Sequence, residues 1–300
     1  MTRQHSDLTI SVVIPAKNEA ENLITLLPKL TAIMPHAEII VVNDGSTDNT
    51  VEICEQNGVN YISHPYSIGN GASIKTGARA AQGDILVFMD GDGQHDPEDI
   101  PQLLEPLYSN YDLVVGSRNS GNHASIYRRI GNHLFNSLAS VMTGHKILDL
   151  TSGFRAVRAR HFKKFLYLLP NGFSYPTTST MAFFRSGLPV KYIPITTKKR
   201  QGKSNIKILR DGIRFLLIII KIGALFSPMR FFLPISLFVF CTGFGNYIYT
   251  YITMGRFTNM SALLFTSSLL VFLIGILSEQ ISALHYKGTD ENARHTARDD

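Results

Sequence analysis

Three kinds of residue are scarce in this 300-residue chain: tryptophan is absent, cysteine occurs twice, and charged residues make up only 17%. With only two cysteines, the chain cannot be a domain stabilised by several disulfide bonds. A typical soluble domain has about 25% charged residues, so apolar residues are in excess here. The 18 Phe and 12 Tyr residues can build a core, which excludes global disorder. Met1–Ile10 lacks the apolar segment of a signal peptide, so we expect the first domain to stay in the cytoplasm.

Positive charge is concentrated in one segment. The net charge of the chain is +6, and the segment from Lys198 to Arg230 alone carries nine basic residues and one acid, Asp211. Cationic and aliphatic residues alternate over residues 204–228, which favours an amphipathic helix at a membrane surface over an ordinary surface helix. Nucleic acid is a less suitable partner, because the segment precedes an apolar stretch and carries no nucleic-acid motif.

Two long uncharged runs follow this segment, Phe231–Ile252 and Ser261–Leu277. Each is close to the roughly 20 residues that cross the ~30 Å hydrocarbon core of a bilayer. Basic residues flank both runs and the short connection carries only Arg256, so the positive-inside rule places both termini in the cytoplasm. We therefore expect a multi-pass protein of the plasma or inner membrane. Its expected parts are an interfacial segment at 204–230, two transmembrane helices within 231–283 (about 231–252 and 261–281) and a polar cytoplasmic tail at 284–300.

The first 118 residues alternate short Val- and Ile-rich runs with helical patterns, which predicts an α/β fold. The expected strands are Leu8–Ile14, Glu38–Val42, Val59–Ser63, Asp84–Met89 and Asp112–Val115. The expected helices cover residues 19–34, 48–57, 72–82 and 97–109. This order is typical of a parallel sheet covered by helices on both faces. For the less regular residues 119–200, we expect helices at Ile126–Met142 and His161–Leu169 and strands at Phe183–Phe184 and Val190–Ile195.

Polar clusters follow three of the predicted strands. They are Pro15–Glu19, Asn43–Ser46 and Asp90–His95. Ligands of open α/β sheets bind at the carboxyl ends of the strands, so we expect the three clusters to meet in one crevice.

The third cluster suits a metal ion. Asp90, Asp92 and Gln94 offer oxygen ligands at alternate positions, as suits Mg²⁺ or Mn²⁺ bridging to a substrate phosphate. An EF-hand is excluded, because Pro101 stands where its last ligand would be. A phosphatase of the Asp-x-Asp type is also excluded, because its nucleophile follows the first strand and this motif follows the fourth.

Two further features each allow two interpretations. Asp44 is suited to bind a nucleobase or ribose, and equally to form a turn at the start of a helix. The segment Gly69–Gly71 opens a helix, so its amides are suited to an anion, or its glycines serve a loop with positive φ. Gly202–Ser204 is not a phosphate loop, because Thr197 replaces the glycine that such a loop requires.

Taken in order, seven short motifs resemble those of family 2 glycosyltransferases. The resemblance is closest to the polyprenyl-phosphate branch typified by dolichyl-phosphate mannose synthase, and it covers roughly residues 9–228. The motifs are Val13–Glu19, Val42–Ser46, Gly69–Ala72, Met89–His95, Val115–Arg118, Thr151–Arg155 and Arg200–Ser204. The two apolar runs resemble the two-helix membrane anchor of bacterial members. The resemblance implies a Rossmann-like GT-A nucleotide-sugar-binding domain over residues 1–203, followed by the interfacial helix and two transmembrane helices.

The resemblance also implies a reaction. A hexose would be transferred with inversion from a nucleotide-sugar to a polyprenyl phosphate, such as undecaprenyl or dolichyl phosphate, with Mg²⁺ or Mn²⁺ as cofactor. UDP-hexose is the favoured donor, GDP-mannose stays open, and the relatives suggest a homo-oligomer. An anionic lipid phosphate needs no strong general base, but two phosphates held together need a cationic clamp, for which arginine is suited.

Particular residues receive roles from the resemblance. The expected catalytic residues are Asp90, Asp92, Arg118 and Arg200. The nucleotide is expected to contact Pro15, Glu19, Asp44 and Asp90. The diphosphate and the acceptor phosphate are expected to contact Arg118, Arg128, Asn132, Arg200 and Ser204. Asn132 stands where the family often has serine, and its amide can donate a hydrogen bond to phosphate in place of the hydroxyl. The expected metal ligands are Asp92 and Gln94.

Other functions were weighed on the same residues. A processive polysaccharide synthase of this fold is excluded, because its Gln-x-x-Arg-Trp motif needs a tryptophan and it has more membrane spans. A sugar nucleotidyltransferase is excluded, because Pro15–Glu19 stands where its glycine-rich loop would be. Two alternatives stay open: a glycosyltransferase with another membrane acceptor, and a non-catalytic, membrane-anchored protein that binds nucleotide-sugars.

Overall fold

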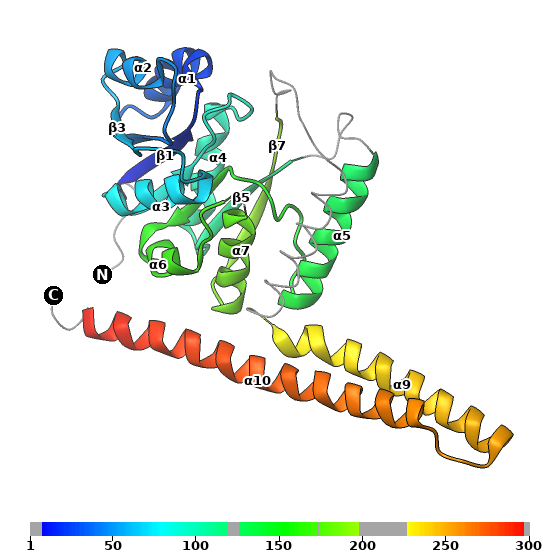
Figure 1. Ribbon diagram of the computed structural model, residues 1–300. Coiled ribbons are helices and arrows are strands. Elements are labelled where there is room, and N and C mark those ends of the chain that lie inside the picture. Colours follow the sequence, from blue (N-terminus) through cyan, green and yellow to red (C-terminus); the bar gives the residue numbers. More distant parts are fainter. Residues whose placement is uncertain (1–7, 119–125, 173, 198–226, 297–300) are drawn as a thin grey trace. The chain divides into compact units, whose positions relative to one another are not determined.

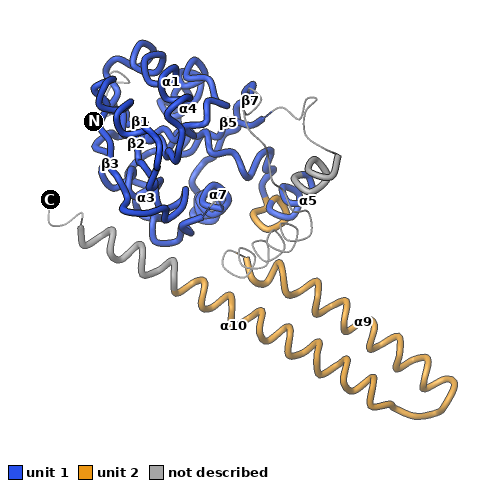
Figure 2. Tube along the Cα trace, turned by 45° about the horizontal axis from the view of Figure 1, so that its top comes forward, with its two compact units in different colours: residues 1–139, 145–205 blue, residues 140–144, 206–300 orange. Residues whose placement is uncertain are grey.

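The computed structural model describes residues 8–118, 126–172, 174–197 and 227–296 (Figure 1). The chain divides into two compact units (Figure 2). Unit 1 comprises Met1–Ala139 and His145–Asn205, and unit 2 comprises Ser140–Gly144 and Ile206–Asp300. The predicted amphipathic helix falls on residues 204–228, of which nearly all lie outside the described residues.

Unit 1 is built on a seven-stranded sheet with the order β3-β2-β1-β4-β6-β5-β7. The strands are β1 (Ile10–Ala16), β2 (Glu38–Asn43), β3 (Asn60–Ser63), β4 (Ile85–Phe88), β5 (Leu113–Arg118), β6 (Arg155–Arg158) and β7 (Val190–Ile195). The five N-terminal strands expected from the sequence are confirmed, with ends shifted by up to three residues, and Val190–Ile195 is confirmed as a strand.

The parallel sheet predicted for the first 118 residues is confirmed, because β1 to β5 all run in one direction, and one further strand, β6, joins it in the opposite direction. This strand is antiparallel to both of its neighbours, β4 and β5, so the sheet is mixed. β6 is not predicted from the sequence, because the strand is only four residues long and has arginine at both ends.

Seven α-helices accompany the described part of the sheet. They are α1 (Ala20–Ile33), α2 (Thr50–Gln56), α3 (Asn70–Ala80), α4 (Ile100–Tyr108), α5 (Ile126–Thr143), α6 (Ala159–Lys164) and α7 (Tyr175–Arg185). Unit 1 also contains two 3₁₀ helices, η2 (Pro97–Asp99) and η3 (Leu166–Leu168). The strand expected at Phe183–Phe184 is wrong, because these residues lie in α7. That helix is buried along nearly its whole length, so its sequence shows no amphipathic period.

Alternate side chains of β1 pack against two layers of helices. Val12 and Ile14 join a buried cluster to which α1 and α4 contribute leucines. Val13 faces α3, which approaches closely because residue 77 is glycine. An added Cβ at Gly77 would lie 2.3 Å from Val13 Cγ1 and 3.1 Å from Val42 Cγ2. Glycine in the middle of α3 therefore sets the distance between helix and sheet.

Unit 2 contains a hairpin of two long helices, α9 (Pro228–Met254) and α10 (Asn259–Thr296) (Figure 2). Pro228–Met254 and Asn259–Leu284 are long and apolar enough to cross a membrane. Only 11% and 17% of their most apolar stretches are buried inside the protein, whereas a core helix of a soluble protein is mostly buried. The two helices are therefore candidate membrane spans.

Small and hydroxyl residues join α9 to α10. Ser236 Oγ donates to the Ser268 carbonyl and Ser268 Oγ donates to the Ser236 carbonyl, each at 2.9 Å. Near the far end of the hairpin, Asn246 Oδ1 accepts a hydrogen bond from Ser261 Oγ at 2.9 Å. At Gly243 an added Cβ would lie 2.9 Å from the Cβ of a facing leucine, so the backbones approach closely. Small residues and hydroxyl pairs are typical of helix contacts in membranes.

The contact at Gly77 gives a test of the fold. Overpacking costs about 1–3 kcal/mol, and alanine gains roughly 1 kcal/mol over glycine in helix propensity. Because the added carbon would meet Val13 at 2.3 Å, we expect an overpacking cost at the upper end of that range, about 3 kcal/mol. After the gain in helix propensity, Gly77→Ala should destabilise unit 1 by about 2 kcal/mol. Thermal unfolding of the detergent-purified protein measures this as a lower Tm. Gly172→Ala is the control, because nothing lies within 4 Å of its added Cβ. A Tm for Gly77→Ala equal to or above the wild-type value would contradict the packing.

Candidate functional site

The carboxyl ends of four strands lie at one edge of the sheet. β1 is parallel to β2 and to β4, with Ala16 beside Asn43. β6 is antiparallel to both β4 and β5, so β5 also ends at this edge and β6 begins there. The topology therefore brings together the three predicted polar clusters and Arg118, the last residue of β5.

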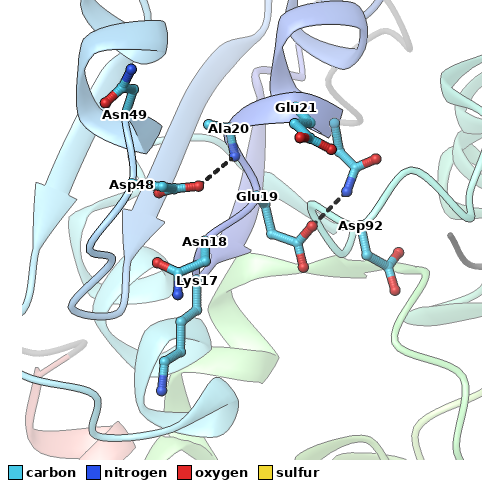
Figure 3. A pocket seen from close by; sticks show the side chains of 9 residues that line it. Lys17, Asn18, Glu19, Ala20, Glu21, Asp48, Asn49 and Asp92 are labelled. Carbon is cyan, nitrogen blue, oxygen red and sulfur yellow. Dashed lines mark hydrogen bonds between the residues drawn. The ribbon is translucent and has the colours of Figure 1, made fainter. Parts of the chain in front are cut away.

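A cavity of about 590 Å³ opens at this edge, between the β1–α1 loop and Asp92 (Figure 3). Its charged lining residues are four acids and one cation: Glu19, Glu21, Asp48, Asp92 and Lys17. In its wall, Ala20 N donates a hydrogen bond to Asp48 Oδ2 at 3.1 Å (Figure 3). A second hydrogen bond in the wall runs from Asn22 Nδ2 to Glu19 Oε2 at 2.6 Å. A lining of this charge attracts cations and repels a diphosphate. A nucleotide diphosphate therefore needs a counter-cation to bind there.

Asn18 in the cavity wall adopts a left-handed backbone conformation, with φ of 55°. Asparagine tolerates this conformation better than most residues. Asn18 Oδ1 accepts a hydrogen bond from Thr47 N at 2.8 Å, and Asn18 N donates to Ser46 Oγ at 2.9 Å. These bonds tie the loop after β1 to the loop after β2, so the two loops form one wall.

The acidic cluster after β4 is also tied to β1. Asp90, Asp92 and Gln94 are each partly exposed, whereas Gly91 between the two carboxylates is buried. Gly91 N donates to the carbonyl of Pro15, a buried residue of β1, at 3.3 Å. Gln94 donates to Asp92 from its backbone N at 3.2 Å and from Nε2 at 2.8 Å. In this structure Gln94 therefore orients the Asp92 carboxylate.

The cluster fits a divalent ion that binds together with a nucleotide. Within the described residues, no group of three or more His, Cys, Asp or Glu side chains forms a complete metal site. Mg²⁺ commonly takes one or two carboxylates from the protein and completes its shell with substrate phosphates and water. Asp92, which also lines the acidic cavity, is placed where it could supply such a carboxylate.

Asp44, for which we predicted base and ribose contacts, is buried and accepts four hydrogen bonds from the protein itself. Oδ1 lies 2.8 Å from both His64 Nδ1 and Ile68 N. Oδ2 accepts from Ser67 Oγ at 2.7 Å and from Gly69 N at 2.9 Å. Burial favours the neutral acid, but the bonds from His64, Ser67 and the two amides hold the pKa of Asp44 below its ordinary value. Asp44 thus holds the 64–69 loop, and a nucleotide would bind it only by replacing one of these donors.

The N-terminus of α3 is closed by neighbouring backbone. Gly69, whose φ is 120°, donates its backbone N–H to Asp44 Oδ2 at 2.9 Å. Ala72 N donates to the Asn171 carbonyl at 3.1 Å. An added Cβ at Gly71 would lie 2.1 Å from the Pro170 carbonyl oxygen. Of the two interpretations of Gly69–Gly71, the structure supports a loop that requires glycine and not an anion site.

Arg118 is held by Asp149, a residue that the sequence analysis did not name. Arg118 Nε donates to Asp149 Oδ2 at 2.8 Å, and Nη2 donates to Oδ1 at 3.0 Å. Burial favours the neutral acid, but Arg118 holds the pKa of Asp149 below its ordinary value, so Asp149 stays ionised. The available signal was an aspartate two residues before Thr151, a spacing typical of a side-chain-to-backbone turn.

The other residues predicted to contact phosphate lie wholly or in their side chains outside the described residues. Arg128 and Asn132 lie in α5, but their side chains fall outside the described residues. Arg200 and Ser204 also lie outside the described residues.

Arg155, the last residue of the Thr151–Arg155 motif, belongs to the core. Its side chain is fully buried, and Nη1 donates to the Pro176 carbonyl at 3.0 Å and to Ser179 Oγ at 2.7 Å. Burial lowers its pKa. Arg155 therefore joins β6 to α7 and does not face the cavity.

His95 lies buried under the site, with 7% of its surface exposed. Its ring stacks on Phe154 at a centroid distance of 4.9 Å, and its Nδ1 has no hydrogen-bond partner among the residues that the structure describes. Burial lowers the pKa of His95 to about 4, although the charge of Asp92 opposes the shift. His95 is therefore neutral at physiological pH.

The mixed sheet, the acidic cluster at its edge and the apolar hairpin are the features of a GT-A glycosyltransferase with a membrane anchor. Comparison with known families agrees: residues 11–166 match Glycosyl transferase family 2, and residues 227–284 match the GtrB C-terminal hairpin. The chain belongs to glycosyltransferase family 2.

Similar proteins include named glycosyltransferases. The glycosyltransferase AglJ of Haloferax volcanii is 26% identical over 291 residues, which cover 92% of this chain and 94% of AglJ. An undecaprenyl-phosphate 4-deoxy-4-formamido-L-arabinose transferase of Pseudomonas fluorescens is 33% identical over 191 residues, which cover 57% of this chain and 56% of that enzyme. Among solved structures, glucosyl-3-phosphoglycerate synthase of Mycobacterium tuberculosis with Mn²⁺, UDP and glucosyl-3-phosphoglycerate shares the fold. Its TM-score is 0.59 at 22% identity, over 73% of this chain and 82% of that chain.

The buried His95 predicts a pH dependence of stability. Its pKa is about 4 when folded and 6.5 ordinarily, so the unfolded chain binds a proton first as the pH falls. The neutral ring contributes fully above pH 6.5, and this contribution is lost between pH 6.5 and 4, by roughly 3 kcal/mol in total. The variant His95→Phe keeps a stacking ring that does not titrate. We expect its Tm to fall less than that of the wild type over this pH range. Parallel curves for the two proteins would show that His95 is not held neutral by burial.

Proposed function

We propose that this glycosyltransferase moves a hexose from a nucleotide-sugar to a polyprenyl phosphate, with inversion at the anomeric carbon and with Mg²⁺ or Mn²⁺. The observation that carries the proposal is the placement of Asp90, Asp92 and Arg118 at one sheet edge, in a chain that also has an apolar hairpin. The name of the P. fluorescens relative supports the acceptor, because it specifies undecaprenyl phosphate.

A UDP-hexose is the donor we favour. Structures of the M. tuberculosis synthase contain UDP with Mn²⁺ or Mg²⁺, or UDP-glucose with Mn²⁺. The acidic lining of the cavity is consistent with a donor that arrives together with a divalent cation. GDP-mannose is the second donor to be tested.

The residues account for the chemistry without a general base. An oxygen of the lipid phosphate bonds to the anomeric carbon as the bond from that carbon to the nucleotide diphosphate breaks, and the diphosphate leaves. The lipid phosphate is already anionic, so the protein has no proton to remove. Asp92, with Asp90 beside it, would hold a divalent ion that neutralises charge on the leaving diphosphate. Arg118 would donate hydrogen bonds to a phosphate oxygen, and its planar guanidinium suits this geometry.

The hairpin would anchor the catalytic unit on the cytoplasmic face of the membrane, with both termini in the cytoplasm. Basic residues precede α9, whereas the loop between α9 and α10 contains Arg256 alone. In this orientation the polar head of the acceptor lies at the same surface as the anchored unit. The transferred sugar would then remain attached to lipid.

A donor screen tests the proposed reaction. Detergent-purified protein receives undecaprenyl phosphate, Mn²⁺ or Mg²⁺, and one of UDP-glucose, UDP-galactose, UDP-GlcNAc or GDP-mannose. We expect one UDP-hexose to give a chloroform-extractable glycolipid. Nucleotide binding with no lipid product from any donor would contradict the acceptor, and no nucleotide binding at all would overturn the proposed function.

The metal and Asp92 are tested on the productive donor. We expect Asp92→Asn to lower the rate by about 10²-fold or more, because a preorganised charge that stabilises the leaving group is lost. EDTA should abolish product, and added Mn²⁺ or Mg²⁺ should restore it in the wild type. Glu98→Gln is the matched control, since this carboxylate is 70% exposed and pairs with Lys29. A fully active Asp92→Asn protein would show that the carboxylate is not part of the site.

A further inference from the structure

The guanidinium of Arg118 is bound along one edge by the protein. Asp149 accepts hydrogen bonds from Nε at 2.8 Å and from Nη2 at 3.0 Å. The second hydrogen of Nη2 goes to Thr151 Oγ1 at 2.6 Å. A guanidinium carries five N–H donors, so two hydrogens on Nη1 remain. Neither has an acceptor among the residues that the structure describes.

Asp149 is the fixed member of this pair. Its Oδ1 accepts hydrogen bonds from Thr151 N and Ser152 N, both at 3.1 Å, and its Oδ2 accepts one from Arg118 N at 3.3 Å. The Asp149 side chain is 10% exposed, whereas that of Arg118 is 38% exposed. The backbone therefore orients the carboxylate, and the carboxylate orients the more exposed guanidinium.

The pair lies close to the acidic cluster. An added Cβ at Gly153, in the segment that follows Asp149, would lie 2.8 Å from Asp90 Oδ2. Burial disfavours the charged guanidinium, but Asp149, and after it Asp90, raise the pKa of Arg118 above its ordinary value. Arg118 thus stays charged within electrostatic range of Asp90.

We propose that Asp149 is a positioning residue for Arg118, which it holds by Nε and Nη2 so that Nη1 meets a phosphate oxygen of a substrate. This inference rests on the proposed function. The phosphate belongs to the nucleotide or to the lipid acceptor, and the chemistry is the same: an anionic oxygen accepts hydrogen bonds from Nη1. Lysine cannot replace Arg118 here, because one ammonium lacks the fork that pairs with a carboxylate and a phosphate together.

The test is a double-mutant cycle in the full-length protein, with the single variants Asp149→Asn and Arg118→Gln and the combined variant. Asp112→Asn is the matched control. Asp112 precedes the opposite end of β5, is 14% exposed and pairs with Arg158 at 3.3 Å. Asp112→Asn thus removes a comparable ion pair at the other end of the same strand, away from the site. Thermal unfolding of every variant reports its stability.

We expect Asp149→Asn to lower kcat/KM by about 10- to 100-fold, as is common when a residue that orients a functional group is lost. Its Tm should fall no further than that of Asp112→Asn. In the Arg118→Gln background, Asp149→Asn should lower kcat/KM by less than about two-fold, because residues that act through one contact are not additive. If the fold-loss of kcat/KM in the double variant equals the product of the two single fold-losses, the proposal is overturned. If Asp149→Asn does not fold, Thr151→Val, which removes the acceptor of Nη2, goes through the same cycle.

Two binding measurements identify the phosphate. The Kd for UDP with Mn²⁺ is measured by calorimetry without acceptor, and the KM for undecaprenyl phosphate is taken from initial rates. A raised Kd for UDP in both single variants assigns Nη1 to the nucleotide, and a raised KM for the lipid alone assigns it to the acceptor. If neither changes, the positioning role is wrong. If the wild type forms no glycolipid, the proposed function fails, and the cycle is run on the Kd for UDP. If the variants leave the Kd for UDP unchanged, or if their effects on this Kd are additive, the positioning role of Asp149 is wrong, whether or not the proposed function holds.

Discussion

The reversal of β6 between β4 and β5 is the constraint on which the site depends. Had β6 run parallel to its neighbours, the segment before it would enter the sheet at the opposite edge. Because β6 is antiparallel, that segment reaches the edge at which β4 and β5 end. Gly153 brings it against Asp90 with no side chain between them. One reversed strand of four residues therefore supplies Asp149 to a site that is otherwise built from parallel strands.

The buried Arg155 explains how so short and polar a strand is stable in the interior of the sheet, between β4 and β5. Its guanidinium donates to Ser179, to Thr180 and to backbone carbonyls of Ser152 and Pro176. A buried charge is costly without compensation, and here the hydrogen bonds and the more distant charges of Asp149 and Asp90 offset that cost. The carboxylates of the site thus also stabilise the cation that anchors β6.

The sequence was informative where local pattern and chemistry agree. The Val- and Ile-rich strands and the polar clusters after them were recognisable, because a buried parallel strand is apolar along its length and its carboxyl end is a ligand site. β6 and α7 were not recognisable, because a four-residue strand with two arginines and a helix buried on nearly all sides lack the usual periodicities. The pairing of Arg118 with Asp149 depends on the strand order, which no local pattern of residues encodes. For the same reason, the four bonds that Asp44 receives from the 64–69 loop were not foreseeable.

The reciprocal bonds between Ser236 and Ser268 affect how the hairpin can move. Each hydroxyl reaches the other residue's carbonyl, so both are satisfied in one alignment of α9 and α10. Sliding one helix past the other by a turn, about 5.4 Å, would separate both pairs at once. Such bonds contribute only about 0.6 kcal/mol each on average, too little to hold two helices together. Their effect is selective: among several alignments with similar apolar packing, they favour one. If the two candidate spans cross a bilayer, the hairpin would therefore tilt there as a single body while its internal register stays unchanged.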